Sequence, residues 1–327
     1  MEPEEARTLI EKHPGSSKVL MPYLNGEDVA QRHDQSASRW IINFYDWPLN
    51  REQSPENYTG HVATDFSDCY ARIERLVKPE RAKSNRKVYR ERWWQYAEKQ
   101  PKLYGLLGKM KRVLVTPQVS KHNIVTFAPT NQVISMMLIV LVFDDDASFA
   151  LLQSTLHEEW VRFYSSSLET RRRYIPTDCF DTFPFPKNAL ILTDIGNRYF
   201  RQRAAITSDR LEGLTKTYNR FHSPDETSAD IQNLRQLHVE MDNAVAAAYG
   251  WADLDLDHDS HETKQGVRYT ISEPARREVL ARLLKLNHER YAEEVKQGLH
   301  DKKKPKASKK AAKADDNLTL FAEDAHE

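Results

Sequence analysis

Two stretches of this chain concentrate cationic side chains of the kind that contact phosphate groups. The first stretch, before and into a Trp pair, contains Arg81, Lys83, Arg86, Lys87, Arg90 and Arg92. The second, directly before a tyrosine, is the triplet Arg171, Arg172 and Arg173. Lys and Arg supply sequence-independent affinity for a nucleic-acid backbone. The alternative interpretations are a solubilising segment for the first stretch and cations at a helix C-terminus for the second.

A third stretch carries polar side chains on expected turns between strands. Its residues include Gln118, Ser120, Lys121, His122, Asn123, Asn131 and Gln132. Lys, Asn and Gln side chains hydrogen-bond to base edges in the major groove. Loops on a rigid sheet are a common place for recognition side chains. Each of these residues also suits an ordinary turn, so the stretch predicts a reading surface without fixing which side chain touches a base.

The sequence lacks the local motifs of the common catalytic sites. There is no Pro-Pro dipeptide, so the Asn/Asp-Pro-Pro-aromatic motif of amino-methylating enzymes is missing, and the glycines form no GxG. P-loop, HExxH and GxSxG motifs are missing too. One ExK string, Glu262–Lys264, follows the Asp-rich stretch 253–259. One interpretation of that arrangement is a divalent-metal site for DNA hydrolysis. The simpler interpretation is a solvated loop.

Composition excludes several other classes of protein. The formal net charge is zero, which argues against a histone-like polycation, so any nucleic-acid surface must come from local clusters. The two cysteines, Cys69 and Cys179, form no CxxC pair, which argues against a disulfide scaffold or structural zinc. The acidic N-terminus lacks the apolar region of a signal peptide. The longest apolar run, 133–143, is about half a membrane span, so we expect a buried strand, no membrane partner and a cytoplasmic location.

The periodicity of apolar residues predicts an α+β fold. Short Val- and Ile-rich runs predict strands at 20–25, 38–47, 111–117, 122–128 and 132–143. Helical spacing predicts helices at 2–12, 58–77, 148–166, 198–211, 228–249 and 273–299, with Asp145 or Asp146 capping the third and Gly250 ending the fifth. We therefore expect a mixed α/β domain with a central sheet at 1–187 and a mostly helical region at 188–300. The Lys-rich segment 301–327 is expected to be disordered.

Several segments, in this order, resemble a known family. They are VLMPYLNGED at 19–28, RWIINF at 39–44, VKPER at 77–81, RWW at 92–94, LQSTLHEEW at 152–160, CFDTFPFP at 179–186, TKTYNRFH at 215–222, and 234–251. Together they resemble the C-terminal half of the type IIG/IIL (MmeI-like) restriction–modification methyltransferases. The resemblance covers about residues 15–300, and its specificity lies in the order and spacing of the segments.

The resemblance implies a target-recognition function in phage defence or restriction–modification. The cationic stretches and the polar turns described above would then contact double-stranded DNA. In the family a catalytic domain precedes this region, holds S-adenosylmethionine and methylates adenine. No such domain is visible in this chain, so the expected partner is a separate methyltransferase domain or subunit. The alternatives are a truncated, non-functional remnant and the metal-dependent hydrolase.

The C-terminal tail contains one further short motif. Asn317–Phe321, NLTLF, resembles peptides that dock in the bacterial sliding clamp. A chance apolar pair in a disordered tail is the alternative. The lysines that precede the motif are expected to add non-specific DNA affinity.

Overall fold

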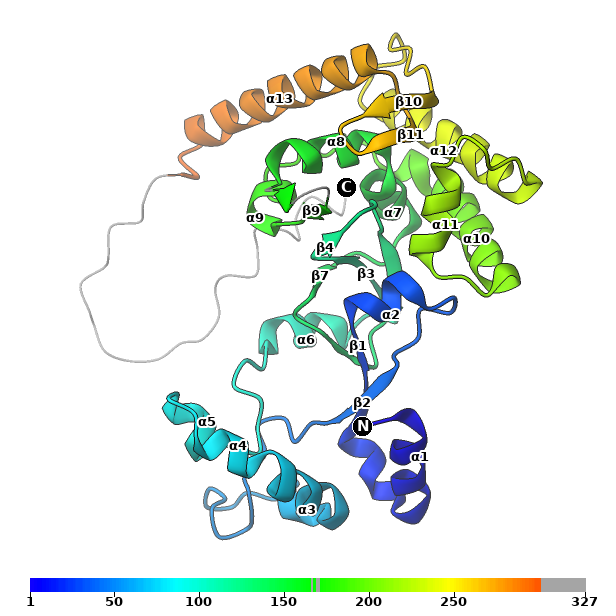
Figure 1. Cartoon of the computed structure of the whole chain (residues 1–327). Coiled ribbons are helices and arrows are strands. Elements are labelled where there is room, and N and C mark those ends of the chain that lie inside the picture. Colours follow the sequence, from blue (N-terminus) through cyan, green and yellow to red (C-terminus); the bar gives the residue numbers. More distant parts are fainter. Residues whose placement is uncertain (166, 169–170, 301–327) are drawn as a thin grey trace. The chain divides into compact units, whose positions relative to one another are not determined.

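The computed structural model describes residues 1–165, 167, 168 and 171–300. The chain forms two units, Met1–Asn287 and a second unit from His288 onward. Helices and small sheets both contribute to the first unit, so the expected α+β class is confirmed (Figure 1). The predicted tail, with Asn317–Phe321, lies outside the described residues. Among the described residues no helix combines the length and apolarity needed to cross a membrane.

The N-terminal part of the first unit surrounds a small core of its own. Its elements are α1 (Pro3–Lys12), η1 (Pro14–Lys18), β1 (Leu20–Leu24), α2 (Gly26–Gln31), β2 (Arg39–Ile42), η2 (Ala63–Asp65), α3 (Ser67–Leu76), α4 (Lys78–Ala82), α5 (Lys87–Glu91) and α6 (Pro101–Leu107). Phe44, Phe66 and Trp93 are buried together in this core. The predicted helix 58–77 is wrong in its first half. Val62 N–H donates to the Asp65 carboxylate there, which turns the chain before α3 begins.

The central part contains the sheet predicted from the Val- and Ile-rich runs. Its strands are β3 (Arg112–Pro117), β4 (Val119–Ser120), β5 (Thr126–Pro129), β6 (Val133–Ile134) and β7 (Leu138–Leu141). β3 lies between β5 and β7, antiparallel to both, whereas β6 pairs parallel with β1. The predicted single strand 132–143 is therefore wrong. Ser135 accepts from Leu138 N–H at 2.9 Å, and this turn sends the chain from one sheet to another.

The helix predicted at 148–166 is two helices, α7 (Asp146–Gln153) and α8 (Thr155–Tyr164). Asp145 caps α7 by accepting from Ser148 N–H at 2.7 Å, as expected. Ser154 has an extended backbone and accepts from His157 N–H, so it ends one helix and caps the next. A serine at such a position competes with the helical backbone for hydrogen bonds.

The remaining elements begin with a small strand pair and continue mostly as helices. They are β8 (Ser167–Leu168), β9 (Arg171–Arg173), α9 (Pro176–Cys179), η3 (Leu190–Leu192), α10 (Thr193–Arg210), α11 (Leu214–Phe221), α12 (Ala229–Ala248), β10 (Asp259–Thr263), β11 (Gly266–Thr270) and α13 (Glu273–Lys296). The expected helices 198–211, 228–249 and 273–299 are thus confirmed to within a few residues at their ends.

One large apolar core joins the central sheet to these helices. Val115 of β3, Leu152 of α7, Leu234 of α12 and Val279 of α13 are all buried within it. In Figure 1 α10, α11 and α12 lie side by side against α7. Gly196 permits the closest approach, because a Cβ there would lie 2.0 Å from the Asp146 carbonyl oxygen. The boundary expected near residue 187 stays a prediction.

Candidate nucleic-acid interface

The polar turn segment and the Arg triplet, about fifty residues apart in the sequence, lie in one small sheet. β4 pairs antiparallel with β9, and β9 pairs antiparallel with β8. The backbone of Gln118 joins one end of this sheet to the segment before β7: its carbonyl accepts from Tyr174 N–H at 2.8 Å, and its N–H donates to Met137 O at 2.9 Å. We name β4, β9, β8 and the turn 120–123 the anchored sheet.

The middle residue of the Arg triplet supports the anchored sheet from inside. Arg172 is buried; its Nε donates to His122 O at 3.2 Å and a terminal nitrogen donates to Thr116 Oγ1 at 3.3 Å. Burial lowers the pKa of Arg172 to about 10, so the guanidinium keeps its charge at neutral pH. Side chains alternate along a strand, and the next residue, Arg173, is exposed. Arg171 pairs through its backbone with Leu168.

The turn 120–123 is held by buried contacts to the helices. His122 Nε2 and Lys121 Nζ both lie 3.0 Å from Asn219 Oδ1 on α11. Burial and the nearby Arg268 lower the pKa of His122 to about 3, so the ring is neutral at pH 7. Asn123 is buried and donates to Leu152 O at 3.1 Å. His122 and Asn123 therefore position the turn, whereas Lys121 and the separate turn residue Asn131 are exposed.

A buried arginine of α10 extends these supports. Arg203 donates to Val125 O at 2.8 Å, and to Gln153 Oε1 and Tyr218 Oη at 3.0 Å each. Gln153 in turn donates to Asn123 O at 2.8 Å. The residues just after the turn are thus joined to α7, α10 and α11. Neither Arg203 nor Gln153 stands out in the sequence, because nothing local distinguishes a buried arginine from an exposed one on a charged helix.

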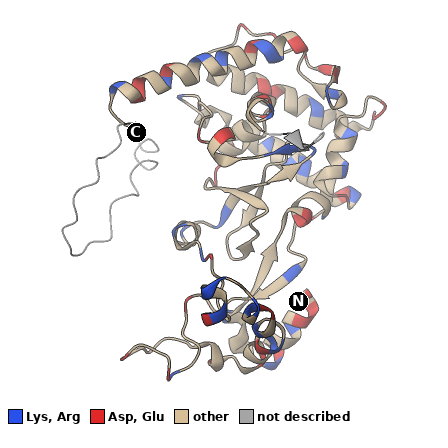
Figure 2. Cartoon of the chain, turned by 60° about the vertical axis from the view of Figure 1, so that its left-hand side comes forward, with Lys and Arg blue, Asp and Glu red and all other residues tan. Residues whose placement is uncertain are grey.

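The first basic stretch occupies α4, α5 and their flanks, and we name residues 78–92 the α4–α5 segment. Arg81 faces inward: it donates to Trp93 O at 3.0 Å and to Gln95 O. The other cations of this stretch are exposed: Lys83, Arg86, Lys87, Arg90 and Arg92. Lys83 pairs with Glu80, Arg86 with Glu98 and Lys87 with Glu91, and Arg90 donates to Ser84 O. Figure 2 shows blue and red side chains interleaved on these helices. Trp93 is buried and Trp94 half-buried, so the pair serves the core.

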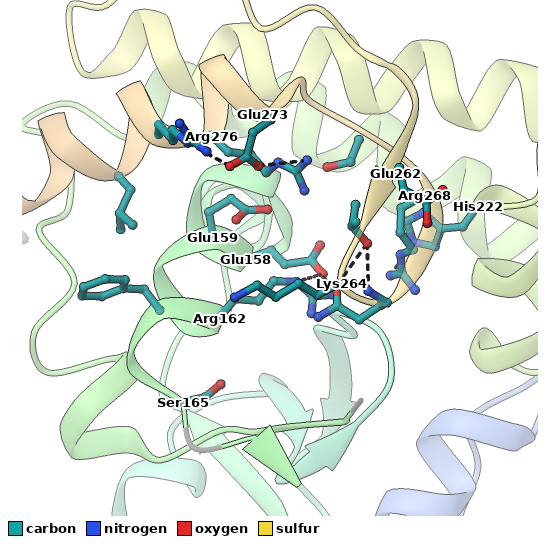
Figure 3. A pocket seen from close by; sticks show the side chains of 16 residues that line it. Glu158, Glu159, Arg162, Ser165, His222, Glu262, Lys264, Arg268, Glu273 and Arg276 are labelled. Atoms are coloured by element: carbon teal, nitrogen blue, oxygen red, sulfur yellow. Dashed lines mark hydrogen bonds and ion pairs between the residues drawn. The ribbon is translucent and has the colours of Figure 1, made fainter. Parts of the chain in front are cut away.

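A polar pocket lies beside the anchored sheet, and its lining includes the ExK string Glu262–Lys264. It has a volume of about 630 Å³ and is bounded by α8, the β10–β11 hairpin and the first turns of α13 (Figure 3). Its charged lining comprises Glu158, Glu159, Arg162, Glu262, Lys264, Arg268, Glu273, Arg276 and Arg277. Nothing local in the sequence joins the ExK string to Glu158 and Arg162 of α8, which lie about a hundred positions away.

The two adjacent glutamates of this pocket have opposite electrostatic surroundings. Arg162 Nε donates to Glu158 at 3.0 Å. Burial raises the pKa of Glu158, but Arg162 and Arg268 outweigh it and hold the pKa well below its ordinary value. For Glu159, burial and the adjacent Glu158 carboxylate dominate and raise the pKa to about 7. At neutral pH this adjacent pair therefore consists of one firmly ionised and one half-protonated carboxyl.

Among the residues considered for metal binding or catalysis, Glu262 and Lys264 line this pocket, whereas several others have partners within the protein. Asp253, in the Asp-rich stretch, pairs with Arg282 at 2.7 Å. In residues 1–165, 167–168 and 171–300, no group of three or more His, Cys, Asp or Glu side chains is placed to hold a metal ion. Asp242 is buried and accepts from Thr155 N–H at 2.9 Å, and His258 Nε2 lies 2.8 Å from its carboxylate. His238, one turn earlier at 3.5 Å, completes a cluster that supports α8 and α12.

Comparisons with known proteins agree on one family. The family model "MmeI, target recognition domain" matches residues 1–187. A solved structure of the type IIL restriction–modification enzyme MmeI in complex with DNA has a similar fold, with a TM-score of 0.61 and 17% sequence identity. The similarity covers 89% of this chain but 34% of that one, so the chain spans about a third of the length of that enzyme. No curated protein sequence matches.

Proposed function

Because the chain belongs to the MmeI target-recognition-domain family, we propose that it reads a specific sequence in double-stranded DNA. The observation that carries this proposal is the anchored sheet. It brings two chemically suitable segments to one place and fixes them through buried contacts, while leaving Lys121 and Arg173 exposed. A reading surface needs both properties, because a base-edge hydrogen bond tolerates little positional freedom.

The two basic regions would have different tasks in such a complex. Arg173 and the polar turn would face base edges, and Lys83, Arg86, Lys87, Arg90 and Arg92 would contact phosphates. Arg172, His122 and Asn123 would act indirectly, since their side chains are committed to the protein interior. Phosphate contacts orient the duplex without carrying sequence information, and base contacts supply the specificity.

Methylation itself would belong to a catalytic domain or subunit outside this chain. We propose that this partner holds S-adenosylmethionine and modifies an adenine within the site that this chain selects. The cytoplasmic location follows from that partnership. Docking of Asn317–Phe321 to a sliding clamp stays a separate proposal, since those residues lie outside the described part of the chain.

Selection from a random-sequence duplex pool at two salt concentrations tests the proposal. The purified chain is expected to enrich one short motif, and the enrichment should persist at the higher salt. Binding that collapses with salt and enriches nothing would contradict it, because only a phosphate surface would then remain. Absence of any binding would favour a non-functional remnant.

A further inference from the structure

The pocket between α8, the β10–β11 hairpin and α13 contains cationic donors that the protein itself leaves unpaired. Among the described residues, Lys264 makes no ion pair within 4.0 Å, and it lies at the tip of the hairpin. Arg276 Nε is buried without a hydrogen-bond partner. The tight turn behind Lys264 ends at Gly266, whose φ of +87° favours glycine. Figure 3 shows Lys264 extending from the hairpin across the pocket toward Arg162 of α8.

Two of the four glutamates that line the same pocket are ion-paired, Glu158 and Glu273. Glu158 accepts from Arg162, and Glu273 pairs with Arg277 at 2.9 Å and with Arg276 at 3.3 Å. Glu159 and Glu262 are the exceptions, because no described cation lies within ion-pair distance of either, and Glu159 stands directly beside Glu158 on α8. A carboxyl in this position opposes an incoming anion when it is ionised and accommodates one when it is protonated.

The position of the pocket indicates which anion it would receive. Ser165 lines it and lies two residues before β8, so the pocket begins where the anchored sheet ends. A duplex lying on that sheet would carry its sugar–phosphate backbone past this opening. The three walls come from α8, the hairpin and α13, and the last two belong to the region that follows residue 187.

We propose that this pocket binds a backbone phosphate of the recognised DNA through Lys264 and Arg276, and that Glu159 takes up a proton when the phosphate enters. The inference rests on the proposed function, because the phosphate belongs to the same duplex. It adds a second contact region, whose two cations lie outside the matched residues 1–187. It also makes DNA affinity depend on pH.

The charged groups around Glu159 determine the direction of that dependence. They are Glu158 and Arg162 on α8, Glu273 and Arg276 on α13, Glu262, Lys264 and Arg268 on the hairpin, Arg172 on β9 and His222 on α11. Burial and Arg268 hold the pKa of His222 well below its ordinary value, so this ring does not titrate near neutrality. Glu159, whose pKa is about 7, does titrate near neutrality. DNA affinity should therefore fall as pH rises through about 7.

Salt titrations with the full chain and a labelled random-sequence duplex test the phosphate contact. Lys264→Ala is expected to weaken binding and to reduce the slope of log affinity against log salt by about 1. Lys216→Ala, an exposed lysine on α11, is the matched control and should leave the slope unchanged. An unchanged slope and affinity in Lys264→Ala would overturn the phosphate site.

A pH series on the same duplex tests the proton. The wild-type chain should lose affinity from about pH 6 to about pH 8, and Glu159→Gln should bind over that range with the affinity that the wild type has at the acidic end. Glu56→Gln, an exposed glutamate elsewhere, should behave like the wild type. A wild-type affinity that is flat with pH would overturn the role of Glu159.

The two hypotheses fail separately in these experiments. If the chain selects a motif and Lys264→Ala changes neither its affinity nor its salt slope, the proposed function stands and the phosphate pocket is refuted. If the chain selects no motif but Lys264→Ala reduces the salt slope, the pocket stands as a DNA-backbone site and sequence recognition is refuted. If the chain binds no duplex, both hypotheses are refuted.

Discussion

The anchored sheet and the α4–α5 segment are both rich in cations, but their cations have different partners. In the anchored sheet Arg172 is buried on neutral acceptors, and its neighbour Arg173 is exposed. In the α4–α5 segment most of the cations are exposed, and four of them pair with a nearby glutamate. Exposed pairs of this kind contribute about 0–1 kcal/mol to stability and exchange partners readily. The first region is built to hold a geometry, and the second supplies adjustable charge.

Removing a buried support of the anchored sheet should have the largest effect. Arg203→Met deletes the buried donors to Val125 O, Gln153 Oε1 and Tyr218 Oη, which removes the link between α10 and the residues after the turn. We expect the free energy of unfolding to fall by about 3 kcal/mol in urea denaturation. Arg201→Met, on the exposed side of the same helix, should change it by less than about 0.5 kcal/mol. Equal effects of the two variants would contradict the anchoring role.

Removing an exposed cation of the same region should affect binding instead of folding. Arg173→Ala should weaken binding to the selected duplex by about 1–3 kcal/mol, the range for one good base contact. Its unfolding free energy should stay within about 0.5 kcal/mol of the wild type, because the side chain is exposed. A loss of affinity that is equal on all sequences would assign Arg173 to the phosphate backbone.

The pocket beside the sheet predicts a pH-dependent stability. Glu159 has a pKa raised to about 7, so the folded state retains a proton that the unfolded chain releases near pH 4.5. Its stabilising contribution is therefore complete below about pH 4.5 and is lost as pH rises through 7. Glu159→Gln should be more stable than the wild type at about pH 8, by on the order of 1–2 kcal/mol, and the difference should shrink toward pH 5. Thermal unfolding of both proteins between pH 5 and pH 8 checks this prediction. A stability difference that does not change with pH would contradict the raised pKa of Glu159.

The α4–α5 segment should give the smallest effects on stability. The double variant Arg86→Ala/Lys87→Ala removes two exposed ion pairs, and because such pairs contribute little to stability we expect the urea midpoint of unfolding to stay at the wild-type value. If both cations contact phosphates, affinity should fall equally on all duplexes, and the salt slope should drop by about 2. A change confined to the selected motif would show that this segment also reads sequence.

Local signals in the sequence predicted much of the fold. The cap at Asp145 and the strand 112–117 follow from residue type and alternation, and both are present. The interruption at Ser154 was not predicted, because the apolar spacing continues through it. The burial of Arg172 and His122 was not predictable either, since it depends on β3, α11 and β11, which lie far away in the sequence. The meeting of the Glu262–Lys264 string with Glu158 and Arg162 in one pocket was unpredictable for the same reason.

Parallel selection experiments test the central claim, that the anchored sheet reads sequence and the α4–α5 segment supplies charge. The random-duplex selection would be run with the wild type, Arg173→Ala and Arg86→Ala/Lys87→Ala. We predict that Arg173→Ala loses the base preference at one or two adjacent positions of the motif, while the double variant recovers the complete motif with lower affinity. An unaltered motif from Arg173→Ala, with a degraded motif from the double variant, would contradict the claim and exchange the tasks of the two regions.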